Sequence, residues 1–371
     1  MRKAARSRVL LAGSVPVLLA LSLAFSTACA ASGSSQGGGS SQDDGGKGSS
    51  NLNGAGATFP APIYQQMFQQ LAQDKQIQVN YQAIGSGGGI EQFTNKTVDF
   101  GASDAPMKDE QMQNAGGDPQ HIATVGGAVV ATYNVEGVQS GLKLKGQTLA
   151  DIFQGKITKW NDPTIVQDNP NVNLPDADIA VVHRSDGSGT TNIFSSYLSA
   201  VSSDWKNQVG AGTELSWPVG IGAKGNDGMA GEVSRTPNTI GYVELAYATE
   251  NNLPYASIQD ANGEFVEPSL DSARAAIENA DIPDDLRVTI SSANPSGNNV
   301  YPITGLTWLL IRNEQDDLSK CQALAQMAWY VTHDGQNLAP DQNYVQLPDN
   351  VVKLDEDKIK NFQAGGQSCY Q

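Results

Sequence analysis

Apolar residues recur along this chain with two alternating periods, one typical of helices and one of strands. Residues 60–74 carry them four positions apart, as one face of a helix does, whereas residues 77–84 alternate apolar and polar side chains, as a half-buried strand does. The apolar run "IAVV" at 179–182 is followed by a second helical pattern over 190–201. This alternation predicts an α/β fold.

The later part of the chain continues the same alternation. We expect strands within residues 97–104, 123–135, 239–248 and 301–311, and a last helix within 318–335.

Three polar junctions rich in small residues stand where these elements begin or end. They are "GAGATFPAP" (54–62), "AIGSGGGIEQF" (83–93) and "HRSDGSGTTNIF" (183–194). A helix start offers unpaired N–H groups and a partial positive charge, and glycine lets that backbone approach a ligand closely. One such loop fits a plain capped helix equally well. Three of them, with an adjacent arginine, favour an oxyanion site.

The junctions hold a set of hydrogen-bond donors suited to an oxyanion. Arg184 can bind a carboxylate or phosphate as a fork, and Asp186 is spaced to hold its guanidinium from behind. A surface ion pair of little energetic value is the alternative for these two residues. Six further positions offer O–H or N–H protons: Thr58, Phe59, Ser86, Ser188, Gly189 and Thr190.

Asp104, in "DFGASDAP", has two interpretations that the residues alone leave open. It can cap a helix. Facing hydrogen phosphate, it can instead accept the remaining proton of the ligand in a charge-assisted hydrogen bond. Because sulfate carries no proton near neutrality, the same carboxylate would repel sulfate.

Catalysis has less support. Ser188 is the candidate nucleophile of a phosphatase, but "DGSGT" lacks the G-x-S-x-G pattern. The three histidines of the sequence, His121, His183 and His333, lack the spacing of a metal pair. His183 also alternates with Arg184 along a strand, so the two should point to opposite faces. We expect no enzyme, no metal and no cofactor.

The N-terminus has the pattern of an export signal: the basic "MRKAARSR", an apolar stretch and the small residues "STACA". We expect a signal peptide over residues 1–28, with a membrane anchor as the alternative. The Gly/Ser-rich residues 29–50 predict a flexible tether. Cys29 at the cleavage point resembles the acylated cysteine of bacterial lipoproteins, although Ser26 stands where such signals usually carry leucine. Cleavage after Ala30 would release a soluble protein instead.

The other two cysteines, Cys321 and Cys369, form an even pair in an exported chain. Oxidising conditions favour a disulfide between them, and two buried free thiols are the alternative.

Length and charge narrow the function further. About 320 residues follow the tether, more than one core usually organises, so we expect two domains. The formal net charge of −16 argues against nucleic-acid binding, which needs a basic surface. An anion site in this chain must therefore act through local geometry.

Seven stretches together resemble a known family. "GAGATFPAPIY", "YQAIGSGGGI", "TVDFGASDAP", "GKITKWND", "VVHRSDGSGTT", "KGNDG" and "IGYVELAYA" stand in the order found in the substrate-binding proteins of the bacterial high-affinity phosphate import system. The likeness runs from about residue 51 to the C-terminus. It implies a two-lobed periplasmic-binding-protein fold of the second type, with a hinge and one phosphate between the lobes. It also implies permease subunits of an ABC transporter as partners; a receptor of this fold for sulfate or molybdate is the alternative.

The resemblance assigns phosphate contacts to eight residues: Thr58, Phe59, Ser86, Asp104, Arg184, Ser188, Gly189 and Thr190. It implies that Asp104 accepts the proton of the ligand, in place of a helix cap, and that Asp186 pairs with Arg184. Gly87 and His183 depart from the residues usual in the family without removing an expected contact.

The family implies that the chain passes from one lobe to the other and back again. Residues 51–125 and 301–371 would form one lobe and residues 126–300 the other, with the disulfide inside the first. The tether, the acylated Cys29 and the disulfide resemble the versions of Gram-positive bacteria. They imply an extracytoplasmic monomer anchored to the outer face of the cell membrane.

Overall fold

The computed structural model describes residues 50–370. The expected signal peptide, Cys29 and almost all of the expected tether lie outside the described residues. Among the described residues, no helix combines the length and the hydrophobicity that crossing a membrane requires.

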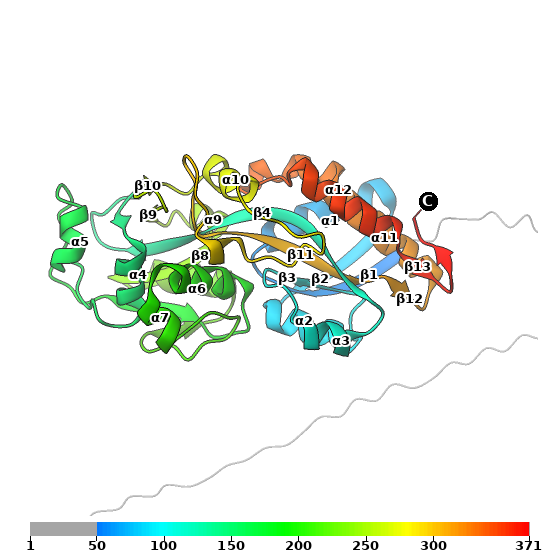
Figure 1. Ribbon diagram of the computed structural model, residues 1–371, viewed down its shortest axis with the longest axis horizontal. Coiled ribbons are helices and arrows are strands. Elements are labelled where there is room, and N and C mark those ends of the chain that lie inside the picture. Colours follow the sequence, from blue (N-terminus) through cyan, green and yellow to red (C-terminus); the bar gives the residue numbers. More distant parts are fainter. Residues whose placement is uncertain (1–49, 371) are drawn as a thin grey trace, which may run out of the picture. The chain divides into compact units, whose positions relative to one another are not determined.

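An eight-stranded mixed sheet runs through the described residues (Figure 1). In spatial order its strands are β2 (Ile77–Ala83), β1 (Ser50–Gly56), β3 (Phe100–Ser103), β11 (Thr304–Arg312), β4 (Pro119–Asn134), β8 (Thr239–Glu244), β6 (Ala180–Arg184) and β7 (Ile221–Ala223). The first three strands are parallel to one another, and so are the last three, whereas β11 and β4 run antiparallel to their neighbours.

Two small sheets accompany the large one. The first contains β10 (Phe265–Val266), β9 (Ser257–Gln259) and β5 (Lys143–Leu144). The second contains β12 (Glu314–Gln315), β13 (Gln363–Ala364) and β14 (Gln367–Ser368).

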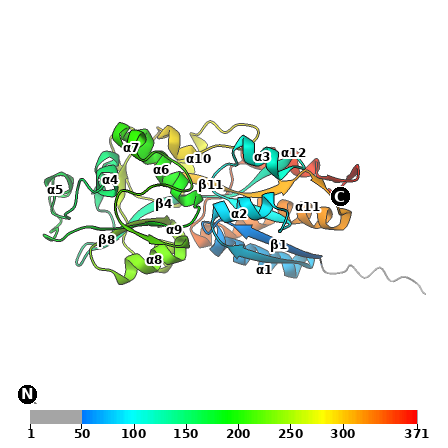
Figure 2. The same ribbon diagram turned by 90° about the horizontal axis from the view of Figure 1, so that it is seen from below.

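Strand β4 joins the two halves of the large sheet. Its residues 119–128 pair with β11, and its residues 129–134 pair with β8. It is buried along nearly its whole length, and apolar and small residues accordingly predominate in its sequence. In both views the blue and red elements, from the two ends of the described chain, gather around one half of the sheet (Figures 1 and 2). The green elements from the middle of the chain gather around the other half.

Helices connect the strands throughout. The α-helices of the described chain are α1 (Ala61–Lys75), α2 (Ser86–Thr94), α3 (Asp109–Ala115), α4 (Gly146–Phe153), α5 (Pro163–Asp168), α6 (Gly189–Val201), α7 (Ser203–Gln208), α8 (Gly225–Arg235), α9 (Leu245–Glu250), α10 (Leu270–Glu278), α11 (Leu318–Thr332) and α12 (Asp349–Lys360). Short 3₁₀ helices span Ile290–Ala293, Asp334–Leu338 and Pro340–Gln342.

Most elements predicted from periodicity are present. Helix α1 buries Ile63, Met67 and Leu71. Proline is tolerated in its first turn, because the N–H groups there have no intrahelical acceptor. The strand expected within 239–248 is present as β8, but it ends at Glu244. The Glu244 side chain accepts a hydrogen bond from the backbone N–H of Ala246 at 2.7 Å and so caps α9, which replaces the second half of the strand.

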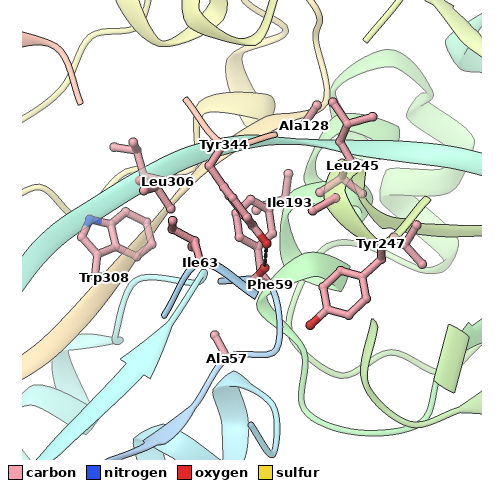
Figure 3. Close-up of a cluster of buried hydrophobic side chains, with 14 of the residues drawn as sticks. Ala57, Phe59, Ile63, Ala128, Ile193, Leu245, Tyr247, Leu306, Trp308 and Tyr344 are labelled. Carbon is pink, nitrogen blue, oxygen red and sulfur yellow. Dashed lines mark hydrogen bonds between the residues drawn. The ribbon is translucent and has the colours of Figure 1, made fainter. Parts of the chain in front are cut away.

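A buried cluster holds the first polar junction against the rest of the fold (Figure 3). It contains Ala57, Phe59, Ile63, Ala128, Ile193, Leu245, Tyr247, Leu306, Trp308 and Tyr344. The Tyr344 hydroxyl donates to the Phe59 carbonyl at 2.6 Å, and the Tyr247 hydroxyl donates to the Thr58 carbonyl at 2.6 Å. These two bonds fix the backbone of Thr58 and Phe59.

Cys321 and Cys369 form a disulfide, as the sequence predicts. It ties the C-terminal residues to α11, and both cysteines are buried.

Candidate oxyanion site

The polar junctions predicted from the sequence lie together where strands of the large sheet end. Ser86, the first residue of α2, links two of them through its hydroxyl oxygen. This oxygen accepts the backbone N–H of Gly189, the first residue of α6, at 3.1 Å and the backbone N–H of Asp104, just after β3, at 3.1 Å. The Gly87 N–H also donates to the Gly187 carbonyl at 2.8 Å. Residues distant in sequence thus share one buried site.

Thr58 and Thr190 meet through a residue that the sequence analysis did not assign. The side-chain amide of Asn226 donates to the Thr58 hydroxyl oxygen at 2.9 Å and to the Thr190 hydroxyl oxygen at 3.1 Å. All three side chains are buried. Asn226 therefore connects the loop after β1 to the starts of α6 and α8.

Arg184 supplies a buried positive charge with one unused edge. Its side chain is 1% exposed, and it binds Asp186 as a fork at 2.7 Å (Nε to Oδ1) and 2.5 Å (Nη2 to Oδ2). Asp186 also accepts the Gly225 N–H at 3.1 Å. Burial raises the pKa of Asp186, but the bonds from Arg184 and Gly225 outweigh it and hold the pKa below its usual value. Nη1 of Arg184 is buried without a hydrogen-bond partner among the described residues, so it is left for an anion.

Asp104 is a buried carboxyl whose pKa is raised, whereas the pKa of Asp186 is lowered. Its Oδ1 accepts the Thr307 hydroxyl at 2.9 Å, and its Oδ2 lies 3.4 Å from the Ser86 hydroxyl. Burial raises the pKa of Asp104 to about 7, against the Thr307 bond and the nearby Arg184 charge, which lower it. A carboxyl with this pKa exchanges a proton near neutrality. It does not cap the next helix, since α3 starts at Asp109 with Lys108 as its cap residue.

The remaining predicted donors are backbone and hydroxyl groups at helix starts. Ser188 caps α6, and its oxygen accepts the Thr191 N–H at 3.0 Å, which leaves the hydroxyl proton to donate elsewhere. Gly189 opens the first turn of α6, and its backbone N–H, which has no intrahelical acceptor, donates to the Ser86 hydroxyl oxygen at 3.1 Å. The Phe59 N–H has no hydrogen-bond acceptor among residues 50–370, although its carbonyl is bonded to Tyr344. The Ser188 hydroxyl and the Phe59 N–H can donate to a ligand directly, whereas the Gly189 N–H must first leave the Ser86 oxygen.

Comparison with known proteins decides the family. A model of the PBP superfamily domain matches residues 34–332. The phosphate-binding protein PstS of Xylella fastidiosa is 43% identical over 306 residues, covering 82% of this chain and 84% of that protein. The PstS of Haemophilus influenzae is 44% identical, covering 82% of this chain and 91% of that protein. The chain belongs to the PstS family.

A solved structure supports the same fold. The phosphate-binding protein from Stenotrophomonas maltophilia matches with a TM-score of 0.64 at 18% identity, covering 82% of this chain and 92% of that one. The predicted α/β periplasmic-binding-protein fold is therefore confirmed.

In this PstS-family chain, the three histidines and Ser188 do not form a catalytic group with one another. His121 is buried, accepts the Met107 N–H at 3.0 Å, and has a pKa that burial lowers to about 3. His183 stacks on Trp217, with ring centroids 4.9 Å apart. His333 lies at the end of α11. Within the described chain, the one hydrogen bond of the Ser188 hydroxyl is to Thr191, and no group of three metal-ligating side chains is found.

Asn226 is the site residue that sequence reasoning missed. A signal for it existed, because "AKGNDGMA" repeats the construction of the other junctions: a short strand, β7, then Gly, then the start of α8. "KGNDG" was one of the stretches that resemble the PstS family, but its asparagine received no role there.

Proposed function

We propose that this protein is an extracytoplasmic receptor that binds inorganic phosphate at the oxyanion site and delivers it to the ATP-driven permease of an ABC transporter. The observation that carries the proposal is the pairing of a buried Arg184 edge without a partner and a buried Asp104 carboxyl whose pKa is about 7. The first attracts an anion, and the second accepts a proton from it. Relatives named phosphate-binding protein PstS support this assignment.

Phosphate would be held by hydrogen bonds from both sides of the site. The proposed donors are Arg184, the hydroxyls of Thr58, Ser86, Ser188 and Thr190, and the backbone N–H groups of Phe59 and Gly189. Asp104 is the proposed acceptor of the phosphate proton. Hydrogen bonds to charged groups contribute about 1.5–3 kcal/mol each, whereas micromolar affinity needs about 8 kcal/mol in total. The set is therefore sufficient after the costs of desolvation and ordering.

Binding would close two lobes, 51–125 with 301–371 and 126–300, around the ligand. The proposed contacts come from both segments, and hydrogen bonds join the segments at the site, among them Gly189 to Ser86 and Asn226 to Thr58. A ligand that contacts both lobes stabilises the closed arrangement over the open one.

The location and the partners belong to the same proposal. An acylated Cys29 would anchor a monomer to the outer face of the cell membrane, with the Gly/Ser-rich residues as a tether, near the permease subunits. The role is binding and delivery, not catalysis.

Titration of the protein with phosphate, followed by tryptophan fluorescence with sulfate and molybdate as competitors, tests this function. We expect saturable phosphate binding that a hundredfold excess of sulfate does not displace. Displacement by sulfate or molybdate would favour a receptor for another oxyanion. Turnover of a chromogenic phosphate ester that Ser188→Ala abolishes would favour a phosphatase.

A further inference from the structure

Asn226 lies in the first turn of α8, fully buried, and its side chain bridges two proposed phosphate ligands. The two threonines it contacts, Thr58 and Thr190, are more than a hundred residues apart in sequence. Neither hydroxyl donates a hydrogen bond to another protein atom within residues 50–370.

The orientation of the Asn226 amide is determined by its surroundings. Its Oδ1 accepts the backbone N–H of Glu244 at 2.9 Å. A backbone N–H can only donate, so the oxygen of the amide must face Glu244 and the NH₂ group must face the threonines. The reversed orientation would place two donors against each other.

This orientation sets the polarity of both hydroxyls. The amide nitrogen is only a donor, so the oxygens of Thr58 and Thr190 must be acceptors toward it. The Thr58 oxygen also accepts the backbone N–H of Asn226 at 3.2 Å, which occupies its second lone pair. The Thr58 hydroxyl can therefore only donate its proton elsewhere, and the proton of Thr190 points away from Asn226.

We propose that Asn226 is a positioning residue that fixes the Thr58 and Thr190 hydroxyls as proton donors toward the bound oxyanion. This inference rests on the proposed phosphate-binding function. The bridge leaves Thr58 able only to donate and directs the Thr190 proton away from Asn226 and toward the ligand, so the acceptance of the phosphate proton is left to Asp104. Asn226 also joins Thr58, in one proposed lobe, to the starts of α6 and α8 in the other. The Asn226 amide would therefore orient the two hydroxyls only when the lobes are close together.

Two substitutions separate this role from simple packing. Asn226→Asp keeps the shape and the acceptor for Glu244 but faces the threonines with an acceptor, which turns their protons away from the ligand. Asn226→Ala removes the side chain but leaves the hydroxyls free to rotate. We expect phosphate affinity measured by calorimetry at pH 8 to fall more than a hundredfold in Asn226→Asp and only about tenfold in Asn226→Ala.

The pH dependence of phosphate affinity distinguishes Asn226→Asp from Asn226→Ala further. When the introduced carboxyl is protonated it again donates, so the affinity of Asn226→Asp relative to wild type should recover as the pH falls from 8 to 6. The same ratio for Asn226→Ala should stay constant. Asn192, which donates to Thr289 at 3.3 Å on the same helix as Thr190, offers matched controls. Asn192→Asp and Asn192→Ala should both bind like wild type.

A double-mutant cycle with Thr190→Val tests whether Asn226 acts through the threonine. We expect Asn226→Ala to reduce phosphate affinity by a smaller factor in the Thr190→Val background than in the wild-type background. An equal loss in both backgrounds, or a larger loss in Asn226→Ala than in Asn226→Asp with no pH dependence, overturns the positioning role. Wild-type protein that binds no phosphate overturns the proposed function itself. Thermal unfolding without phosphate identifies any variant that fails to fold.

Discussion

Two carboxyl groups of the oxyanion site, the half-buried Asp186 and the buried Asp104, have opposite pKa shifts because their partners differ. Asp186 receives the Arg184 fork and the Gly225 N–H, so it stays ionised. Asp104 is buried and accepts one short hydrogen bond, from the Thr307 hydroxyl, so burial dominates and raises its pKa to about 7. One aspartate therefore supports the arginine, while the other is free to exchange a proton with the ligand.

Asp104 should lower the stability of the phosphate-free protein at neutral pH. The folded state keeps its proton up to about pH 7, whereas the unfolded state loses it from about pH 4, so the free energy of unfolding falls between those values. Asp104→Asn has no such proton to lose. We expect its advantage over wild type to grow from pH 4 to 7 by up to about 4 kcal/mol and then stay level. Chemical denaturation without phosphate measures this, and a difference constant across that range would contradict it.

Arg184 should be the most costly single residue to remove. Arg184→Ala deletes the charge and leaves Asp186 without its partner, so we expect phosphate affinity to fall by more than a hundredfold in calorimetry. Arg184→Lys keeps the charge but loses the fork, and its affinity should lie between the two. Arg235→Ala, on the exposed side of α8, is the matched control and should bind normally. Near-native affinity in Arg184→Ala would refute the assignment.

Among the elements, the starts of α2, α6 and α8 do most to assemble the site. Each follows a strand of the large sheet through a glycine-containing junction, and the contacts between them are made by backbone groups and short side chains. A Cβ on Gly189 would lie 2.6 Å from atoms of both Asp104 and Ser86. Glycine at this position therefore permits the close approach of α6 to the other junctions.

Gly189→Ala should weaken phosphate binding without unfolding α6. The added methyl group overpacks the contact with Asp104 and Ser86, at a cost of about 1–3 kcal/mol. We expect a loss of affinity of about 5- to 150-fold. Gly228→Ala, in α8 with its nearest neighbour 3.8 Å away, is the control and should keep the affinity while stabilising the helix by about 0.5–1 kcal/mol. Equal affinities in the two variants would contradict the steric role.

Periodicity predicted the elements, but not every boundary or contact. The pattern of α1 was sufficient because its buried face repeats every four residues. It failed after Glu244, where an apolar run continues but a side-chain cap starts α9. Asn226 was missed because its role depends on three partners from distant segments. A single polar residue in a glycine-rich turn does not reveal such a network.

At the scale of the whole molecule, β4 and β11 hold the two halves of the sheet together. The proposed lobes are joined along this pair, and the oxyanion site draws on residues from both. The family resemblance predicted the residues that gather there, since its motifs are long and specific. Periodicity alone could not predict that distant junctions converge, because strand order does not follow from local pattern.

The disulfide should stabilise the fold by closing a long loop. Cys321 and Cys369 are 48 positions apart, a separation for which chain entropy gives about 3–4 kcal/mol. The Cys321→Ser/Cys369→Ser double variant should lose about that much free energy of unfolding in chemical denaturation. A reductant should lower the wild-type value and leave the variant unchanged. Identical unfolding of oxidised and reduced wild type would refute this contribution.

We expect the selection of phosphate over sulfate to depend on Asp104, which is buried and accepts the proton of the ligand. The most direct test of this dependence is calorimetric titration of wild type and Asp104→Asn with each anion under identical conditions. We expect wild type to bind phosphate and to release no measurable heat with sulfate, and Asp104→Asn to lose phosphate affinity and gain sulfate binding. Unchanged selectivity in Asp104→Asn would refute this role of Asp104.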